Sequence, residues 1–582
     1  MCVTVLALLA SAVSMATGGR HCDPAGGCAQ NDSNTHHATK QTNDTCAVWE
    51  TPHTKHLENL QISSRHFIDA FPLDAAGTSV RTVTNGVFSL SAPTPLRGPL
   101  TLVAVSKEVL EDILDLDLSV LQSEDFVHYF SGGKPFPGSV PLAHRYGGHQ
   151  FGYWAGQLGD GRAHLLGEYT NKDGERWELQ LKGSGKTPYS RSGDGRAVLR
   201  SSVREFLCSE AMHYLGVPTS RAASLIVSDE PVWRDQFYDG NVTKERGAVV
   251  LRLAKSWFRI GSLEILARSG EVDLLRKLLD FILEKYFPTI QSNDPDKFLV
   301  FYSKVVNETA QLVARWMSVG FAHGVCNTDN FSLLSVTIDY GPFGFMESFD
   351  PSFVPNWSDD EGRYSMGRQA NGGRFNLGKL AEALGPILRP EQLSLMEQIL
   401  KDYPQIYHKR FLEFFKAKLG LLGHDEKDED LIAFLLKLME DTHADFTMTF
   451  RQLSELSDHQ VQARTIPPEA WAIRDLAMHE LFSTWVDMYV RRLQKQQNDS
   501  DDDRRRRMRS VNPRYVLRNW MAESAIKKAE RNDFSEVHLL QRILRWPFQE
   551  QAAAEAVGYA AQPPAWAREL KINVQPCGCR SF

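Results

Sequence analysis

Apolar residues recur at helical spacing through much of the second half of the chain. Five segments show this pattern over several turns: Leu274–Tyr286, Phe298–Val319, Leu377–Leu388, Glu391–Leu419 and Glu429–Asp441. Pro404 lies inside the fourth segment and lacks the amide hydrogen that a helix interior uses, so we predict a break there. This half of the chain is therefore predicted to be mainly helical.

The first half of the chain has shorter apolar runs. Thr101–Val105 is typical of a strand, and Ser106–Leu121 has apolar residues at helical spacing. Ala163–Tyr169 and Arg176–Lys182 flank a polar turn, which predicts a β-hairpin. A glycine-rich loop then leads into a predicted helix, Ala197–Leu215.

The order of these elements indicates an α+β fold. Phe331–Asp339 is apolar and β-branched, which predicts short strands between the helices. A small β-rich part followed by a larger helical part is also the order found in protein kinases. We therefore expect a kinase-like fold of two lobes, an N-terminal lobe over 58–248 and a C-terminal lobe over 249–490.

Several stretches lie outside these patterns. In the N-terminal tail, 1–57, residues 2–16 are apolar, too short to span a membrane, and similar to the hydrophobic region of a secretory signal peptide. The polar residues 17–55 predict disorder. The charged stretch 491–510 predicts a flexible insert; its arginines suit an acidic partner, but a solvated linker is the preferred interpretation. A helical C-terminal extension, 511–582, is predicted to end in a cysteine-containing tail.

The composition narrows the class of protein. With 582 residues, 42% hydrophobic and 24% charged, the chain can bury a large core without a metal or a disulfide framework. Its net charge of -7 argues against a nucleic-acid binder, and we expect no membrane span. No zinc-type spacing of cysteine and histidine occurs. Cys208 and Cys326 are isolated and are predicted to be small core residues.

Two neighbouring motifs, His323–Asn330 and Thr337–Gly341, contain the strongest candidate catalytic residues. Transfer of a phosphoryl or nucleotidyl group needs a carboxylate near the acceptor hydroxyl and oxygen ligands for Mg²⁺. Asp329 is a candidate base, and Asn330 and Asp339 are candidate metal ligands. Asp-Tyr-Gly resembles the kinase Asp-Phe-Gly motif. The alternative is two polar turns around a short strand.

The spacing of these residues differs from that of a protein kinase. In kinases the catalytic aspartate precedes the metal-binding asparagine by five residues, whereas Asp329 and Asn330 are adjacent. A His-Arg-Asp motif is also missing. These departures argue against an ordinary kinase.

Further cationic residues are placed to contact phosphates. Lys182 ends the predicted hairpin, and Glu205 lies in the helix that follows, as in the lysine–glutamate pair of kinases. The tetrapeptide Gly-Asp-Gly-Arg occurs at 159–162 and again at 193–196. Its glycines allow close backbone approach to an anion, and its arginine allows bidentate contact. Arg252 and Arg259 are additional candidate phosphate ligands.

Four long runs resemble the selenoprotein O family: 146–168, 179–207, 323–346 and 512–537. The resemblance covers roughly residues 60–582. It implies a pseudokinase fold in which ATP lies flipped relative to protein kinases, so that the α-phosphate faces the acceptor. The implied reaction transfers AMP to Ser, Thr or Tyr hydroxyls of protein substrates and releases pyrophosphate.

The resemblance also implies roles for single residues. Asp329 resembles the proton acceptor, Asn330 and Asp339 the Mg²⁺ ligands, and Lys182, held by Glu205, the phosphate-binding lysine. Mn²⁺ suits the same oxygen ligands. The remaining nucleotide contacts implied in this way are Gly159, Gly161, Arg162, Asp194, Gly195, Arg252 and Arg259.

Family members often end in a selenocysteine or a cysteine, and Cys577 or Cys579 would be that redox position. The pair could form a disulfide or react with a partner thiol; unreactive tail thiols are the alternative. The family implies a role in redox homeostasis and a mitochondrial location, whereas the signal-like segment indicates secretion. Two other functions remain open, a kinase that transfers the γ-phosphate and a non-catalytic ATP-binding redox scaffold.

Overall fold

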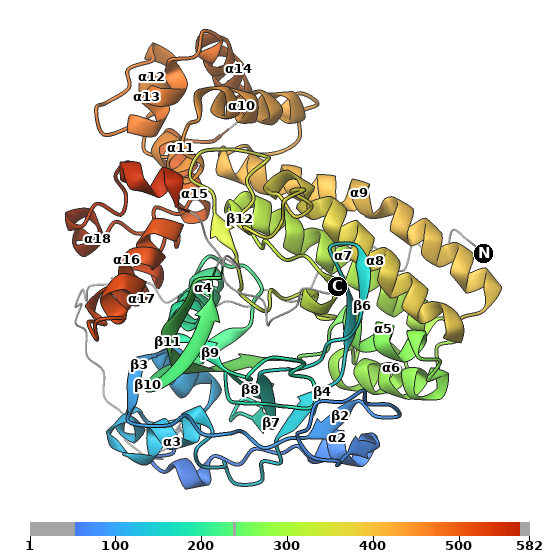
Figure 1. Cartoon of the computed structure of the whole chain (residues 1–582). Helices are drawn as coiled ribbons and strands as arrows, with labels where there is room; N and C mark the ends of the chain where they lie inside the picture. Colours follow the sequence, from blue (N-terminus) through green and yellow to red (C-terminus); the bar gives the residue numbers. More distant parts are fainter. Residues whose placement is uncertain (1–52, 237–239, 497, 571–582) are drawn as a thin grey trace, which may run out of the picture. The chain divides into compact units, whose positions relative to one another are not determined.

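A large mixed sheet contains most of the strands of the molecule (Figure 1). The structure, a computed structural model, describes residues 53–236, 240–496 and 498–570. In these residues the strand order is β1-β2-β4-β7-β8-β11-β10-β3, with β9 paired to β11. Only β1 and β2 are parallel among the pairs described. The strands are β1 (Leu73–Asp74), β2 (Phe88–Leu90), β3 (Leu100–Val105), β4 (Leu142–His144), β7 (Ala163–Thr170), β8 (Arg176–Lys182), β9 (Ala197–Val198), β10 (Arg221–Asp235) and β11 (Val242–Ala254).

Side chains of the sheet alternate between two apolar clusters. On β11, Ala248 and Val250 belong to the cluster that includes the apolar side of α4 (Leu199–Tyr214). Val249 belongs to the other cluster, with residues of α3 (Asp125–Ser131). Because successive strand residues point to opposite faces, β11 is buried on both sides. The predicted lobe boundary after residue 248 falls inside this strand.

The β-hairpin prediction is confirmed, since β7 and β8 pair antiparallel, and β3 agrees with the predicted strand. The single helix predicted over Ser106–Leu121 is wrong. A π-helical turn, Val109–Ile113, and a 3-10 turn, Leu118–Gln122, replace it. Between them Asp115 has a φ of 51°, a left-handed conformation that cannot continue a right-handed helix.

The predicted helices of the second half are present, which confirms the α+β class. They are α6 (Val272–Tyr286), α7 (Lys297–Ser318), α8 (Gln369–Leu384), α9 (Pro390–Lys418) and α10 (Asp428–Thr442), preceded by α5 (Ile260–Arg268). The break predicted at Pro404 is wrong, because α9 continues through it. A proline inside a helix costs about 3 kcal/mol. The long contact of α9 with α7, in which Tyr403 is buried, offsets this cost.

Phe331–Asp339 does not form the predicted strands. Its residues make isolated bridges, Phe331 with Thr337 and Ser332 with Arg259. Ser335 has a φ of 51°, so the segment turns back on itself instead of extending. The short strands nearby are β12 (Phe321–Ala322) and β13 (Gly344–Phe345).

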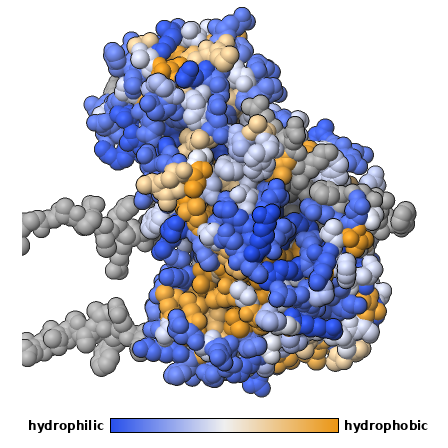
Figure 2. Space-filling view, turned by 60° about the vertical axis from the view of Figure 1, so that its left-hand side comes forward, coloured by the Kyte–Doolittle hydropathy of each residue, from blue (hydrophilic) through white to orange (hydrophobic). Residues whose placement is uncertain are grey.

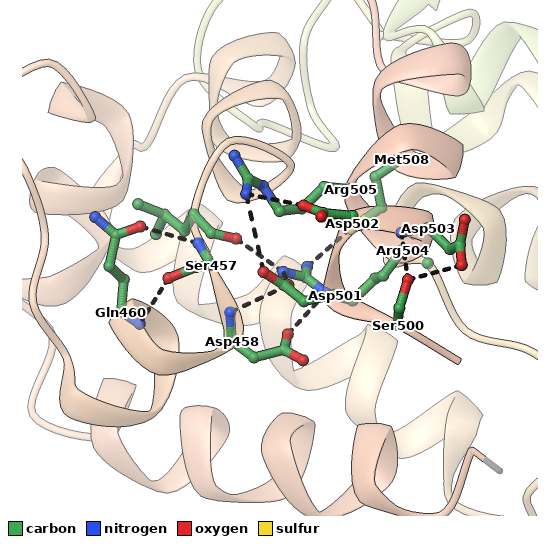
Figure 3. Close-up of polar contacts among 12 residues, drawn as sticks. Ser457, Asp458, Gln460, Ser500, Asp501, Asp502, Asp503, Arg504, Arg505 and Met508 are labelled. Carbon is green, nitrogen blue, oxygen red and sulfur yellow. Dashed lines mark hydrogen bonds and ion pairs between the residues drawn. The ribbon is translucent and has the colours of Figure 1, made fainter. Parts of the chain in front are cut away.

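The charged stretch at 491–510 differs from the flexible insert predicted for it, because α15 (Asp501–Val511) forms within it. Ser500 caps the helix by accepting a hydrogen bond from the Asp503 amide. Arg504 is 1% exposed. Its guanidinium contacts the carboxylates of Asp501 at 2.6 Å and Asp458 at 2.8 Å, and donates to the Leu456 carbonyl at 2.8 Å (Figure 3). Neutralised and hydrogen-bonded in this way, an arginine can be buried.

A second apolar core lies among the helices around this stretch. Besides α10 and α15 it involves α11 (Phe446–Leu453), α12 (Asp458–Ala463), α13 (Trp471–Ala477) and α14 (Phe482–Gln494). Trp485 and Tyr489 of α14 stack with ring centroids 5.1 Å apart. The charged residues of α15 are thus one side of a packed helical region.

The last helices lie against the sheet and α4. They are α16 (Asn519–Ala529), α17 (Ser535–Leu544) and α18 (Ala552–Ala556). His538 and Gln541 of α17 reach the β3 carbonyls of Val103 and Val105, each at 2.6 Å. Since β3 is the last strand of the sheet order, these contacts cover part of its edge.

Much of the surface shown in Figure 2 is hydrophilic, with hydrophobic residues gathered mainly in its lower part. No helix in the described part of the chain is long and apolar enough to cross a membrane.

Cys208 and Cys326 are fully buried, as predicted, and burial raises the pKa of both thiols. The signal-like segment 2–16 and the candidate redox residues Cys577 and Cys579 lie outside the described residues.

Candidate active site

A cavity of about 750 Å³ brings together most of the predicted site residues. Its walls come from the first glycine-rich block, the ends of β8 and β11, α4, and the loops after β12 and before α8. The predicted residues that line it are Gly159, Gly161, Arg162, Lys182, Glu205, Arg252, Asp329, Asn330 and Asp339.

Asp339 is the centre of a network of charges. Its carboxylate contacts Arg252 at 2.5 Å, Arg259 at 2.9 Å and Lys182 at 3.4 Å. Glu205, from α4, contacts both Lys182 and Arg252 at 2.6 Å. Burial alone would raise the pKa of Asp339, but the three cations hold it well below its usual range. Asp339 is therefore a carboxylate that stays ionised.

The predicted pairing of Lys182 with Glu205 is present. Register places Lys182 at the end of β8, opposite Val250 of β11. Burial lowers the pKa of Lys182, and the Glu205 carboxylate opposes that shift. With two carboxylates, two arginines and one lysine in contact, this network has an excess of positive charge that suits a polyphosphate.

Asp329 has a different environment. It is 8% exposed, and its Oδ2 accepts a hydrogen bond from Gln150 at 3.2 Å. Its Oδ1 is buried and has no hydrogen-bond partner. Burial raises the pKa of this carboxyl to about 7, although the charge of Arg259 opposes the shift. Asp329 can therefore gain and lose a proton near neutral pH.

Asn330 follows in the same 3-10 turn, Thr328–Asn330. Its side-chain nitrogen donates to the Val325 carbonyl at 3.0 Å. The amide oxygen is then the atom that remains to act as a ligand. Asp339 itself has a φ of 58°, a strained conformation for a residue with a side chain, and such strain is common at functional sites.

The two Gly-Asp-Gly-Arg loops have different places in the structure. Gly159, Gly161 and Arg162 line the cavity, whereas Asp194 and Gly195 are not among its lining residues. A Cβ at Gly159 would lie 2.4 Å from the Tyr189 ring, so packing alone already requires glycine there. The charged residues of the second loop pair with residues of β10 instead. Asp194 pairs with Arg234 at 2.7 Å, and Arg196 pairs with Glu230 at 3.1 Å. The role of Asp194 and Gly195 as nucleotide contacts stays a prediction.

Arg259 is buried behind the cavity wall. Besides Asp339, it donates to the Asp329 carbonyl at 2.9 Å, and it stacks over the Tyr146 ring at 4.2 Å. This arginine thus links the Asp339 carboxylate to the backbone of Asp329, two residues that the sequence placed in separate motifs.

Sequence reasoning missed several residues of this site. Asp160, inside the first tetrapeptide, is buried in the wall, and burial raises its pKa to about 6. Gln180 contacts Arg252, and Gln150 contacts Asp329. Asp160 could have been found, because it lies inside the Gly-Asp-Gly-Arg motif. The two glutamines could not, because a glutamine has no charge and no characteristic spacing in the sequence.

The fold and the cavity thus define a protein whose site combines a cluster of cations suited to phosphate with a separate titratable carboxylate. The sequence model described as protein adenylyltransferase SelO matches residues 93–545 of the chain. The chain is 46% identical over 484 residues to the protein nucleotidyltransferase YdiU of Xanthomonas campestris pv. campestris (strain B100), covering 83% of this chain and 92% of that protein. The protein of the same name from Azoarcus sp. (strain BH72) is 44% identical over 518 residues, covering 87% of this chain and 97% of that protein.

The chain therefore belongs to the SelO family of protein adenylyltransferases. This membership confirms the family resemblance stated from the sequence. It identifies the chain as an enzyme of the nucleotidyltransferase class, with ATP as substrate and a divalent metal.

Proposed function

We propose that this enzyme transfers AMP from ATP to Ser, Thr or Tyr hydroxyls of proteins, with Asp329 as the proton acceptor. The observation that supports this most strongly is the contrast between two buried carboxylates. Asp339 is surrounded by three cations, whereas Asp329 has one partner-free oxygen and a pKa near neutrality. The ionised Asp339 suits the binding of cations, and Asp329 suits proton transfer.

In the proposed reaction the acceptor hydroxyl oxygen forms a bond to the α-phosphorus of ATP. The bond from that phosphorus to the oxygen bridging to the β-phosphorus breaks, and pyrophosphate leaves. The hydroxyl proton passes to Asp329. Lys182, Arg252 and Arg259 stabilise the negative charge on the phosphates.

The site also fits a divalent metal. Asp339 offers an ionised carboxylate, and Asn330 has its nitrogen tied to a backbone carbonyl, which leaves the oxygen as donor. Oxygen donors of this kind suit Mg²⁺ and Mn²⁺. Bound there, the ion would neutralise phosphate charge and the pyrophosphate that forms.

The proposal includes a kinase-like arrangement of two lobes with flipped ATP. The N-terminal lobe would contain the sheet and α4, and the C-terminal lobe the helices up to residue 490. Because β11 continues to Ala254 without interruption, we place the boundary after this strand and not after residue 248. The redox role of Cys577 or Cys579, a thiol partner, and mitochondrial or secretory targeting stay predictions.

The test is label transfer to protein from ATP labelled at the α- or the γ-phosphate. Wild type is expected to transfer only the α-label, and Asp339→Ala to lose it. Asp502→Ala is a matched control, since that carboxylate is 87% exposed on α15 and outside the cavity. Transfer of the γ-label alone would instead establish a kinase. Binding of ATP without transfer of either label would support a scaffold.

A further inference from the structure

A small hairpin lies directly over the loop that contains Asp329. It consists of β5 (Gly147–Gln150) and β6 (Tyr153–Gln157). Three consecutive hairpin residues contact three consecutive loop residues. The His149 amide donates to Thr328 Oγ1 at 2.7 Å, Gln150 Nε2 to Asp329 Oδ2 at 3.2 Å, and the Phe151 amide to Asn327 Oδ1 at 3.1 Å.

The tip of this hairpin is fixed by further contacts. Phe151 has a φ of 51°, which is unfavourable for a residue with a side chain. Its amide also donates to the hydroxyl of buried Tyr364 at 3.0 Å, and that hydroxyl donates to Asn327 Oδ1 at 2.7 Å. Tyr364 therefore joins the hairpin tip to the Asp329 loop and supports the strained backbone.

The strand itself approaches Asp329 closely. A Cβ at Gly148 would lie 2.7 Å from Asp329 Oδ1, so only glycine leaves room for this carboxylate. On the far side, His149 Nδ1 contacts the buried Glu264 carboxylate of α5 at 2.5 Å. The hairpin therefore cannot shift away from the loop without breaking buried contacts on both of its sides.

The result is an asymmetric carboxylate. Asp329 Oδ2 is held by the Gln150 side chain, while Oδ1 is buried without a partner. A carboxylate free to rotate would exchange its two oxygens. One that is hydrogen-bonded through Oδ2 and packed through Oδ1 against Gly148 is held in a single orientation. Gln150 lines the same cavity as Asp329, so this orientation is set at the cavity wall.

We propose that Gln150 is a positioning residue that holds the Asp329 carboxylate in the orientation in which it receives the proton of the acceptor hydroxyl. This inference rests on the proposed role of Asp329 as base. Gln150 acts on the transfer step through Asp329 and has no part in binding ATP.

Two substitutions test this role. Gln150→Glu keeps the shape of the side chain but lacks the amide donor when ionised, and Gln150→Met removes the donor without adding charge. We expect both to lower kcat for AMP transfer about 10- to 100-fold, which is within the range of a general-base contribution. The KM for ATP is expected to stay within about twofold of wild type, because the phosphate-binding cations are untouched.

Gln157→Met is the matched control on the same hairpin. Gln157 bonds only to the Val83 amide and the Arg81 carbonyl among its described contacts, and it does not line the cavity. Its kcat should stay near the wild-type value. Thermal unfolding of all variants, measured alongside, reports any general loss of the hairpin.

Three results would overturn the proposal: a wild-type kcat in Gln150→Met, a loss expressed in the KM for ATP, or an equal loss of kcat in Gln157→Met. If wild type itself transfers no α-label, the proposed function fails. If wild type transfers it and Gln150→Met is unimpaired, only the role of Gln150 fails.

Discussion

At the scale of single residues, the site separates two aspartates by their surroundings. Asp339 is ionised because three cations contact it, and Asp329 is close to half-protonated at neutral pH because burial dominates. Both residues were predicted as candidates from the sequence, but the difference between their pKa values was not. The difference in pKa depends on how closely Arg252 and Arg259 approach each carboxylate. Both arginines are 70 or more positions away from either aspartate in the sequence.

This difference predicts the pH dependence of the enzyme. Asp329 must be ionised to accept a proton, and its pKa is raised to about 7. The kcat/KM for AMP transfer is therefore expected to rise with pH up to about 7 and to level off above it. A profile that is flat across about pH 6 to 8, or that falls there, would contradict the assignment of Asp329 as base.

At the scale of elements, periodic segments were predictable and special conformations were not. The β7–β8 hairpin and helices α6 to α10 follow from short-range patterns of apolar residues. The turn at Asp115 and the continuity of α9 through Pro404 depend on tertiary contacts that a local pattern does not contain. The same reason applies to the burial of Arg504 in α15, whose guanidinium pairs with Asp458 of a separate helix.

The buried arginine of α15 gives a stability prediction. Arg504→Met removes the guanidinium that contacts the Asp501 and Asp458 carboxylates, both of which are partly exposed. We expect a loss of about 2 kcal/mol in the free energy of unfolding. Arg506→Met, whose side chain is 75% exposed, should change it by less than about 0.5 kcal/mol. Chemical denaturation measures both; equal effects would show that the burial of Arg504 is unimportant.

The C-terminal end of α9 gives a second stability prediction. Lys418 is 3% exposed beside the Phe446 and Phe450 rings, and burial lowers its pKa to about 7. The unfolded chain keeps this proton up to about pH 10.4, so Lys418 costs stability below that pH, and its contribution improves as pH rises from about 7. Lys418→Met should stabilise the protein by about 1–3 kcal/mol at pH 6.

The pH series provides the check on this assignment. The advantage of Lys418→Met over wild type should shrink steadily between about pH 7 and pH 10. If the two proteins differ by the same amount throughout that range, the lysine is charged in the folded state and the assignment is wrong.

At the scale of the whole molecule, charges of both signs meet in the cavity. The chain has a net charge of -7, and the cavity wall carries Arg162, Lys182, Arg191 and Arg252 beside the carboxylates of Asp160, Glu205, Asp329, Asp339 and Asp360. Net charge argued against a nucleic-acid binder and gave no indication of a phosphate site, because it sums over the whole chain. The family match over 93–545 includes the sheet from β3, the cavity and the helices up to α17. Helix α17 covers the β3 edge, and α16 and α17 pack against α4, which carries Glu205. The C-terminal extension is thus packed against one of the elements that form the site.

The most direct test of the account is the identity of the two products. Wild-type enzyme would be incubated with ATP, a divalent metal and a hydroxyl-containing acceptor protein, and the products would be identified by mass spectrometry and ³¹P NMR. We predict AMP joined to the acceptor through a phosphodiester, together with an equal amount of pyrophosphate. A phosphomonoester on the acceptor, together with ADP, would show attack at the γ-phosphorus and would contradict the account.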